Sequence, residues 1–274
     1  MSLVSIIIPT YKPLDYIFEC FESISLQTCD SSIFEVVVVL NGEKEPYYSN
    51  IESALKKNNL KHKLIFTEVK GVSNARNIAL DYIESVNSQY VVFLDDDDKL
   101  SPSFVEECLS KVQSNVIVVC NTKTFVENTD KTFDDDYLSI CFKKNLGQKY
   151  DIVHFRSFLS TVCAKFIPLA IIGKTRFDKK FALGEDSLFG FEISNKIEEM
   201  ILSDENSIYY RRLRLSSASR KKRKKITSIL NSLVLCKKYS QLYFMSKRKY
   251  HFKFYITRIL AEFQYIFRIL IHSK

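Results

Sequence analysis

Short apolar runs punctuate the first 120 residues of the chain. Each run has five to seven residues, is rich in valine and isoleucine, and is bounded by polar or turn-forming residues. A strand that is apolar on both faces is typical of a parallel sheet covered by helices on both sides. We therefore predict five buried strands: Leu3–Pro9, Phe34–Leu40, Lys63–Thr67, Tyr90–Leu94 and Val116–Cys120.

Segments with helical periodicity separate these strands. Ser73 stands at an N-cap position, and Pro102 stands where proline suits the first position of a helix. Strands that alternate with helices predict an α/β fold, with a mostly parallel central sheet and helices on both faces. The predicted helices are Leu14–Leu26, Ile51–Lys57, Asn74–Ile83 and one opened by Ser101-Pro102.

The second half of the chain has weaker periodicity. Residues 121–160 are polar and less regular, whereas Thr161–Pro168 predicts a strand. The segment Gly184–Ile197 predicts a loop that enters a helix. Two long segments rich in apolar residues, Ile226–Phe244 and His251–His272, predict a C-terminal helical extension.

The composition fits a folded protein in a reducing compartment. Apolar residues make up 46% of the chain, with 21 Phe and 15 Tyr, so a sizeable core is expected. Seven scattered cysteines without a CxxC pair favour free thiols over a disulfide framework. Met1 leads directly into an apolar run, and no run of about 18 uncharged apolar residues follows, so we predict no signal peptide and no spanning helix. A cytoplasmic location is expected.

Charge is distributed unevenly along the chain. From Arg211 onward there are 18 Lys and Arg against one acid, Glu262, a net charge of +17, while residues 1–210 carry −9. The run Arg220–Lys225 (RKKRKK) is the densest cationic segment. An acidic body with a strongly basic tail predicts a polyanionic partner for the tail, either nucleic acid or an anionic membrane.

Four polar segments fall where predicted strands end. In an open α/β sheet, ligands bind beyond the carboxyl ends of the strands. This rule directs attention to four segments: Pro9–Tyr11, Asn41–Glu43, Lys70–Arg76 and Asp95–Asp98.

The run Asp95-Asp96-Asp97-Asp98 is the strongest chemical signal. Four adjacent carboxylates at the end of an apolar strand repel one another, and a hard divalent cation relieves that repulsion. Mg²⁺ and Mn²⁺ prefer oxygen ligands completed by substrate phosphates. The alternative is an acidic prelude to the next helix, where carboxylates favour the positive end of the helix dipole. One or two carboxylates suffice for that purpose, so we favour the metal and nucleotide role.

Two further segments carry candidate chemistry. Glu185-Asp186 follows Gly184 at a loop-to-helix junction and suits a general base, although acids are also common at helix starts. Gly71 allows a sharp turn, after which a helix start and Arg76 would face an anion. Alternatively, Arg76 is a surface residue paired with a neighbouring acid.

Taken in order, these segments resemble the inverting family 2 glycosyltransferases, which have the GT-A fold. The resemblance covers about residues 3–220, and its motifs are specific through their order and spacing. The residues that carry it are Val4–Tyr11, Ser23–Gln27, Phe34–Val39, Gly71 with Ala75–Asn77, Phe93–Asp98 and Glu185-Asp186.

The resemblance implies a Rossmann-like, mostly parallel sheet with flanking helices. The transferase domain would cover residues 1–220, with a nucleotide-binding half over about 1–120 and an acceptor half over about 121–220. Residues 221–274 would form a basic amphipathic helical tail. A UDP-sugar donor and a divalent cation, Mn²⁺ or Mg²⁺, are implied.

The resemblance also implies roles by position. Asp186 matches the catalytic base, with Glu185 beside it, and would deprotonate an acceptor hydroxyl that displaces the nucleotide with inversion. Asp97 matches the metal ligand. The residues implied in nucleotide or donor binding are Pro9, Thr10, Tyr11, Asn41, Arg76, Asp95 and Asp96. Many relatives have an acidic residue where Asn41 stands. An amide both donates and accepts hydrogen bonds, so Asn41 could still recognise uracil.

The sequence of the tail predicts a helix that lies on a membrane surface. Its segments are very apolar but too charged to span a bilayer, so we favour an interfacial helix with a basic clamp on anionic lipid. The alternative is a helical pair packed on the body, with the Lys and Arg side chains reaching out to solvent. No recognised nucleic-acid motif accompanies the charge, so nucleic acid is not expected as a partner. We expect peripheral attachment to the inner face of the plasma membrane.

The tail and the family together imply a lipid-linked acceptor. Small members commonly extend surface polysaccharides such as O-antigen, which implies transfer of glucose or galactose to an N-acetylhexosamine-diphosphate-undecaprenol. Two other functions stay open. A sugar-nucleotide pyrophosphorylase would need a glycine-rich loop after the first strand, which Pro9–Pro13 does not provide. A non-catalytic assembly partner would not need the intact aspartate run.

Overall fold

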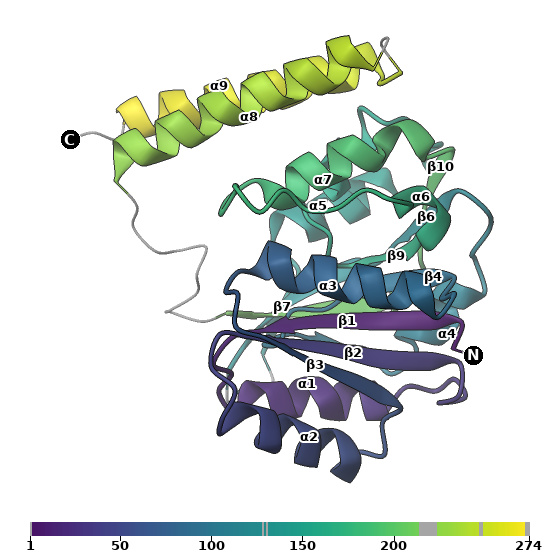
Figure 1. Ribbon diagram of the computed structural model, residues 1–274. Coiled ribbons are helices and arrows are strands. Elements are labelled where there is room, and N and C mark those ends of the chain that lie inside the picture. Colours follow the sequence, from purple (N-terminus) through teal and green to yellow (C-terminus); the bar gives the residue numbers. More distant parts are fainter. Residues whose placement is uncertain (1, 128, 130, 214–223, 247–248, 272–274) are drawn as a thin grey trace.

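The computed structural model describes the chain except for residues 1, 128, 130, 214–223, 247–248 and 272–274 (Figure 1). Most of the predicted basic run Arg220–Lys225 lies outside the described residues; Lys224 and Lys225 are described. Among the described helices, none is long and apolar enough to cross a membrane.

A seven-stranded central sheet forms the core of the body. All five predicted buried strands are confirmed. The strand predicted at Thr161–Pro168 is confirmed over its second half as β9, whereas β10 was not predicted. Pairing is parallel except at β9, which runs antiparallel between β4 and β6. The fourth and fifth predicted strands are therefore not neighbours. In sheet order the strands are β10 (Glu199–Leu202), β6 (Val116–Val119), β9 (Lys165–Pro168), β4 (Tyr90–Phe93), β1 (Val4–Thr10), β2 (Phe34–Asn41) and β3 (His62–Thr67).

Helices cover both faces of this sheet, as predicted. In Figure 1, α1 (Tyr16–Ser25) and α2 (Tyr47–Lys57) lie below the strands, and α3 (Val72–Ser85) lies above them. The side chains of β1 and β2 are buried along the whole length of both strands, apart from the partly exposed Glu35, because helices cover both faces at the centre of the sheet. The carboxyl ends of β1, β2 and β4 meet the start of α3 at one edge, where the site is built.

Two predicted helix starts were wrong by two residues. The cap of α3 is Gly71, whose φ of 125° favours glycine, so Ser73 lies inside the first turn. The next helix, α4 (Phe104–Leu109), is capped by Ser103 rather than opened by Pro102. Ser101 is tied to Ile208 by hydrogen bonds through its backbone N–H and its hydroxyl, which keeps the preceding residues extended.

A second, smaller sheet was not predicted. Its order is β5 (Lys99–Leu100), β11 (Ile208–Leu213), β7 (Asn121–Val126) and β8 (Thr132–Phe133). The region expected to be irregular also contains helix α5 (Tyr137–Asn145) and the 3-10 helix η1 (Phe155–Ser160). The short helix α6 (Leu169–Ile172) follows β9, and η2 (Ser194–Lys196) precedes β10. This sheet places β11 directly behind the aspartate run.

The C-terminal helices form a hairpin on α7 (Glu185–Ile193). Helices α8 (Lys225–Met245) and α9 (Phe252–Ile271) run side by side along the top of the molecule in Figure 1. Their inner side packs Tyr239, Tyr250 and Phe254 around Phe191 of α7, with ring centroids 4.6–5.6 Å apart. The alternative prediction, a helical pair packed on the body, therefore describes this side of the hairpin.

Helix α7 also carries an acid that should make stability depend on pH. Burial, opposed by the charge of Lys238 on α8 and assisted by that of Asp178, raises the pKa of Glu192 to about 7. When folding raises the pKa of an acid, the folded protein holds the proton to a higher pH than the unfolded chain does. The free energy of unfolding therefore falls as the pH rises from the unfolded-state pKa through the folded-state pKa. We expect the wild type to lose about 1–2 kcal/mol between pH 4.5 and 7 from this group, because partial exposure screens the effect.

Glu192→Gln should remove that component of the pH dependence. Urea denaturation of both proteins at pH 4.5, 6 and 7.5 measures it, with Glu199→Gln on β10 as the exposed control. Parallel stability curves for Glu192→Gln and wild type would contradict the assignment.

Candidate active site

A buried arginine joins the two strongest sequence signals. Arg76, on α3, has a side chain that is only 4% exposed. Its Nη1 donates to Asp186 Oδ1 at 2.6 Å and its Nη2 donates to Asp95 Oδ1 at 3.2 Å. Burial alone would lower the pKa of Arg76, but the charges of Asp186 and Asp95 raise it. The end of β4 and the start of α7 are thereby held together around one cation.

This arrangement changes the predicted role of Arg76. We predicted either a side chain facing a bound anion or a surface ion pair. The structure instead shows a buried guanidinium whose partners are two protein carboxylates, with its carbon 5.3 Å from the centre of the Phe177 ring. Its Nε has no hydrogen-bond partner among the described residues. Arg76 therefore orients the site from within.

The four consecutive aspartates have different environments. Asp95 binds Arg76, and Asp96 accepts a 2.5 Å hydrogen bond from the Thr10 hydroxyl at the end of β1. The carbonyl oxygen of Asp97 accepts from Arg212 Nε at 2.8 Å. The side chains of Asp95, Asp96 and Asp97 are partly exposed, whereas Asp98 is buried.

Asp98 joins the two sheets. It accepts hydrogen bonds from the Tyr209 hydroxyl and from the Arg212 backbone N–H, both at 2.8 Å. Burial raises the pKa of Asp98 well above its usual value, and the charges of Asp95 and Asp97 raise it further. Asp98 is therefore a buried acid that links the end of β4 to β11.

Strand β11 supplies site residues that the sequence did not reveal. The Tyr209 hydroxyl also accepts the Asp95 backbone N–H at 3.1 Å. Arg212, whose side chain is 1% exposed, pairs with Glu19 and Glu127. The charge sum for the basic part of the chain starts at Arg211, yet Arg211 and Arg212 lie in the smaller sheet, within the predicted transferase domain 1–220. The sequence signal that could have indicated these residues was the aromatic and basic segment Ile208–Leu213, which is far from the aspartates in sequence.

The aspartate run suits a metal ion whose coordination shell is completed by the phosphates of a substrate. The described residues include no group of three or more His, Cys, Asp or Glu side chains that could hold a metal ion by themselves. Mg²⁺-type ions commonly use one or two carboxylates together with substrate phosphates. The partly exposed carboxylates of Asp95 and Asp97 meet that requirement, whereas the buried Asp98, already bonded to Tyr209 and Arg212, does not.

The predicted base lies at the start of α7. Gly184 caps the helix at a φ of 81°, followed at once by Glu185 and Asp186. Asp186 is 18% exposed, and its second oxygen accepts the Val162 backbone N–H at 3.3 Å. A carboxylate has about four lone-pair positions, so two bonds orient Asp186 and leave capacity for a proton. Burial and the neighbouring charge of Asp186 raise the pKa of Glu185.

The predicted nucleotide side contains one exposed aromatic ring. The side chains of Pro9 and Thr10 are buried in β1, whereas Tyr11 is 44% exposed. Lys12 Nζ and Lys70 Nζ lie 5.9 and 5.6 Å from the centre of the Tyr11 ring. An aromatic face between two cations suits a nucleobase and its phosphates. Within Pro9–Tyr11, only the Tyr11 side chain is exposed enough to be reached by a ligand.

Asn41 ties two of these loops together. Its Nδ2 donates to the Thr10 carbonyl at 2.7 Å, and its Oδ1 accepts the Gly71 backbone N–H at 3.0 Å. The side chain is buried, so both ends of the amide are bonded inside the protein. The amide fixes the end of β1 against the turn before α3.

Comparison with known proteins yields a consistent set of matches. The family model of glycosyl transferase family 2 matches residues 5–166. The chain is 31% identical over 134 residues to the putative glycosyltransferase EpsH of Bacillus subtilis, which covers 48% of this chain and 37% of that protein. It is 27% identical over 232 residues to glycosyltransferase GlyA of Streptococcus pneumoniae, covering 79% and 31%. The chain thus spans about a third of the length of these relatives.

Solved structures share the fold. Staphylococcus aureus TarS 1–349 in complex with UDP-GlcNAc aligns with a TM-score of 0.68 at 18% identity, covering 87% of this chain and 66% of that one. The mannosyltransferase PcManGT of Pyrobaculum calidifontis, in complex with GDP-Man and Mn²⁺, aligns with a TM-score of 0.57 at 16% identity, covering 95% and 73%. The predicted GT-A fold is confirmed.

Proposed function

The chain belongs to glycosyltransferase family 2, and from this premise we propose that it transfers a sugar from a nucleoside-diphosphate donor to a cell-surface polysaccharide acceptor. The observation that carries the proposal is the Arg76 bridge, which places the candidate base Asp186 beside the donor-side Asp95. The family match favours this activity over a sugar-nucleotide pyrophosphorylase. The intact carboxylates favour it over a non-catalytic assembly partner.

Asp186 would act as the general base. Its carboxylate takes the proton of an acceptor hydroxyl while that oxygen attacks the anomeric carbon. The bond from the anomeric carbon to the phosphate oxygen breaks, and the nucleoside diphosphate leaves with the bonding electrons. A single displacement inverts the anomeric centre. Arg76 positions the base and Asp95 with respect to each other.

Asp97, with Asp95 beside it, would hold a divalent cation, Mn²⁺ or Mg²⁺. When bound, the cation supplies Lewis-acid stabilisation of the departing diphosphate. Tyr11 would stack against the base of the donor, with Lys12 and Lys70 at its edges. Asn41 would act through Thr10 and Gly71, whose backbone it fixes.

For the donor we propose a UDP-hexose, with glucose or galactose as the sugar, and for the acceptor an N-acetylhexosamine-diphosphate-undecaprenol. The complex of TarS with UDP-GlcNAc supports the uridine base. A second acceptor class is favoured by the relatives, because TarS is a poly(ribitol-phosphate) β-N-acetylglucosaminyltransferase, 30% identical over 115 residues. A polyol-phosphate polymer is therefore the alternative acceptor.

A donor screen tests this proposal. Purified protein with Mn²⁺ would be mixed with UDP-, GDP- and dTDP-sugars, and nucleotide release followed with each acceptor class and without acceptor. Acceptor-dependent release from one donor, abolished by EDTA, is the expected result. Absence of release and of metal-dependent nucleotide binding would favour the non-catalytic partner.

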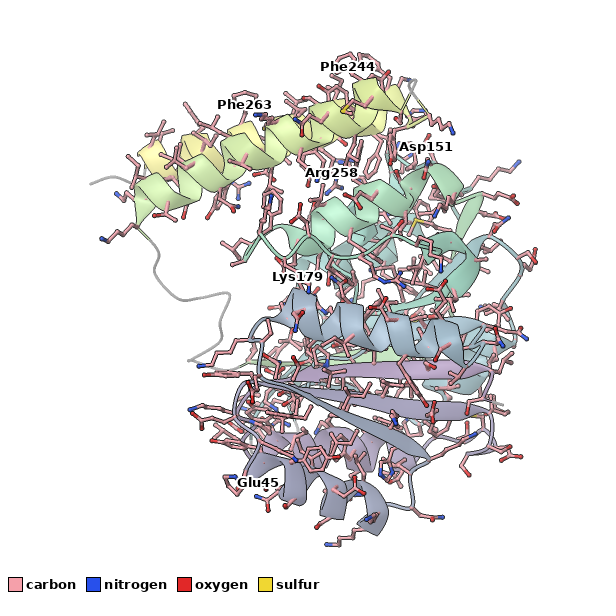
Figure 2. All side chains as sticks on the ribbon, viewed as in Figure 1. Glu45, Asp151, Lys179, Phe244, Arg258 and Phe263 are labelled. Atoms are coloured by element: carbon pink, nitrogen blue, oxygen red, sulfur yellow. The ribbon has the colours of Figure 1, made fainter. Side chains whose placement is uncertain are left out.

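We further propose that the hairpin rests on an anionic membrane surface. Leu260, Phe263, Phe267 and Leu270 recur at helical spacing on α9 and are 53–63% exposed. Figure 2 places Phe263 and Phe244 on the side of the hairpin away from the body, while Arg258 lies on the side that faces it. An exposed apolar stripe on a basic helix is typical of interfacial binding.

Phe263→Asp with Phe267→Asp should release the protein from anionic vesicles. Two buried aromatic side chains are each worth about 1.5–3 kcal/mol, so we expect at least a tenfold loss of binding in vesicle sedimentation. Substitution is preferable to truncation, because the inner side of the hairpin packs on α7. Leu14→Asp, at an exposed apolar position on the body, is the control, and equal binding by all three proteins would contradict the proposal.

A further inference from the structure

A groove of about 480 Å³ lies between α8 and the loop that leads into α7. Its apolar side chains are Phe181, Leu230 and Val234, and its cationic ones are Lys180, Lys237 and Lys238. Leu230 and Val234 are 56% and 53% exposed, which is costly for aliphatic side chains without a partner. Leu230, Val234 and Lys237 follow one another at spacings of four and three residues, so the apolar part adjoins the cationic part along one face of α8.

The groove carries a net positive charge. Asp178 is its one acidic residue against three lysines, and it pairs with Lys238 at 3.3 Å. Within the described part of the chain, Lys180 and Lys237 make no ion pair. Ammonium groups act as compact point charges that suit phosphate. The groove therefore offers an apolar wall next to two cations that have no ion-pair partner among the described residues.

The groove also lies next to the candidate base. Asn231, which lines it, donates to the Leu183 carbonyl at 3.2 Å. Leu183 precedes Asp186 by three residues, which span at most ~11 Å. Leu235 lies one turn further along α8 and packs against Gly184. A Cβ added to Gly184 would lie 2.6 Å from a methyl carbon of Leu235. The groove therefore borders the segment of chain that leads into the candidate base.

We propose that this groove binds the lipid diphosphate of the acceptor, with the hydrocarbon chain against Phe181, Leu230 and Val234 and the phosphates at Lys180 and Lys237. The inference rests on the proposed function in one respect, namely that the acceptor is lipid-linked. An amphiphile with phosphates beside a long chain uses both parts of the groove. A nucleotide or a phosphate polymer would use the lysines and leave the apolar wall exposed.

Binding of a model amphiphile tests the groove independently of catalysis. Full-length protein in EDTA, which silences the metal-dependent donor site, would be titrated calorimetrically with farnesyl diphosphate, farnesol and inorganic pyrophosphate. We expect farnesyl diphosphate to bind about tenfold or more tightly than either fragment. Lys180→Glu with Lys237→Glu should weaken it about tenfold or more. Lys57→Glu with Lys61→Glu, a charge-matched change beside α2 at the opposite end of the molecule in Figure 1, should have no effect.

Equal binding of farnesyl diphosphate by the wild type and the Lys180/Lys237 variant would overturn the proposal. So would pyrophosphate binding as tightly as farnesyl diphosphate, or binding only by a poly(ribitol phosphate) polymer. In transfer assays, the variant should raise KM about tenfold more for a GlcNAc-diphosphate-lipid than for a short alkyl-GlcNAc. If the wild type transfers to neither acceptor but the calorimetry follows the charge change, the proposed function fails and the groove stands.

Discussion

Replacing Asp186 by asparagine should lower kcat about 10²–10⁴-fold, the usual contribution of a positioned general base. Asparagine keeps the size of the side chain and its Oδ1, which accepts the Arg76 hydrogen bond in the structure. The amide oxygen cannot take a proton from the acceptor hydroxyl at neutral pH. Donor binding should stay within about twofold of the wild type, because the base acts on the acceptor.

Turnover and binding are measured separately for this variant. Acceptor-dependent nucleotide release gives kcat, and calorimetric titration with nucleotide and Mn²⁺ gives donor affinity. Glu185→Gln is the neighbouring control, and its loss should be less than tenfold if Glu185 does not exchange the proton. An Asp186→Asn protein that binds donor and turns over at the wild-type rate would remove Asp186 as the base.

Replacing Arg76 by methionine should destabilise the fold by about 2–3 kcal/mol, because it leaves Asp186 without its buried cation, while the 44% exposure of Asp95 lets water screen the second carboxylate. Arg176 provides a matched comparison. It also bridges two carboxylates, Asp81 and Glu84, but its side chain is 22% exposed. Water and ions screen such a pair, so Arg176→Met should cost about 1 kcal/mol or less.

Urea denaturation measures both losses. Arg76→Lys keeps the charge but not the planar fork, so it should fall between the wild type and Arg76→Met, at about 1–2 kcal/mol. This variant keeps the comparison usable if Arg76→Met does not fold. Equal losses at positions 76 and 176 would show that burial of the Arg76 bridge contributes nothing beyond a surface ion pair.

The parallel sheet was predictable because strands buried on both faces appear in the sequence as short, continuous apolar runs. Runs such as Val36–Val39 have no polar side chain, so their periodicity and position determine a strand. The smaller sheet has no such signature. Strand β7 (NTKTFV) is mostly polar, and its partner β11 pairs with it in register from Ile208↔Asn121 onward. The two strands are more than 80 residues apart in sequence, so their pairing depends on the tertiary structure around them.

The chemical types in the site could be predicted, but their partners could not. The sequence showed acids after β4 and at α7, and a basic side chain on α3. It did not show that Arg76 reaches Asp186 across 110 positions, or that Asp98 is bonded to Tyr209. Such contacts depend on which strand lies beside which. The place of β9 between β4 and β6 was not predicted. Just before β9 begins, the Val162 N–H donates to the candidate base Asp186.

The packing of α7 has a consequence for which of its contacts can absorb a substitution. A Cβ at Gly190 would lie 2.3 Å from the carbonyl oxygen of Leu159, so α7 has no clearance on its inner side. Toward the hairpin, by contrast, Phe191 meets the side chains of Tyr239 and Phe254. Side chains can repack, whereas a backbone carbonyl moves only with its segment. A change in the hairpin can therefore be accommodated locally, whereas Gly190→Ala would displace α7 and, with it, Asp186.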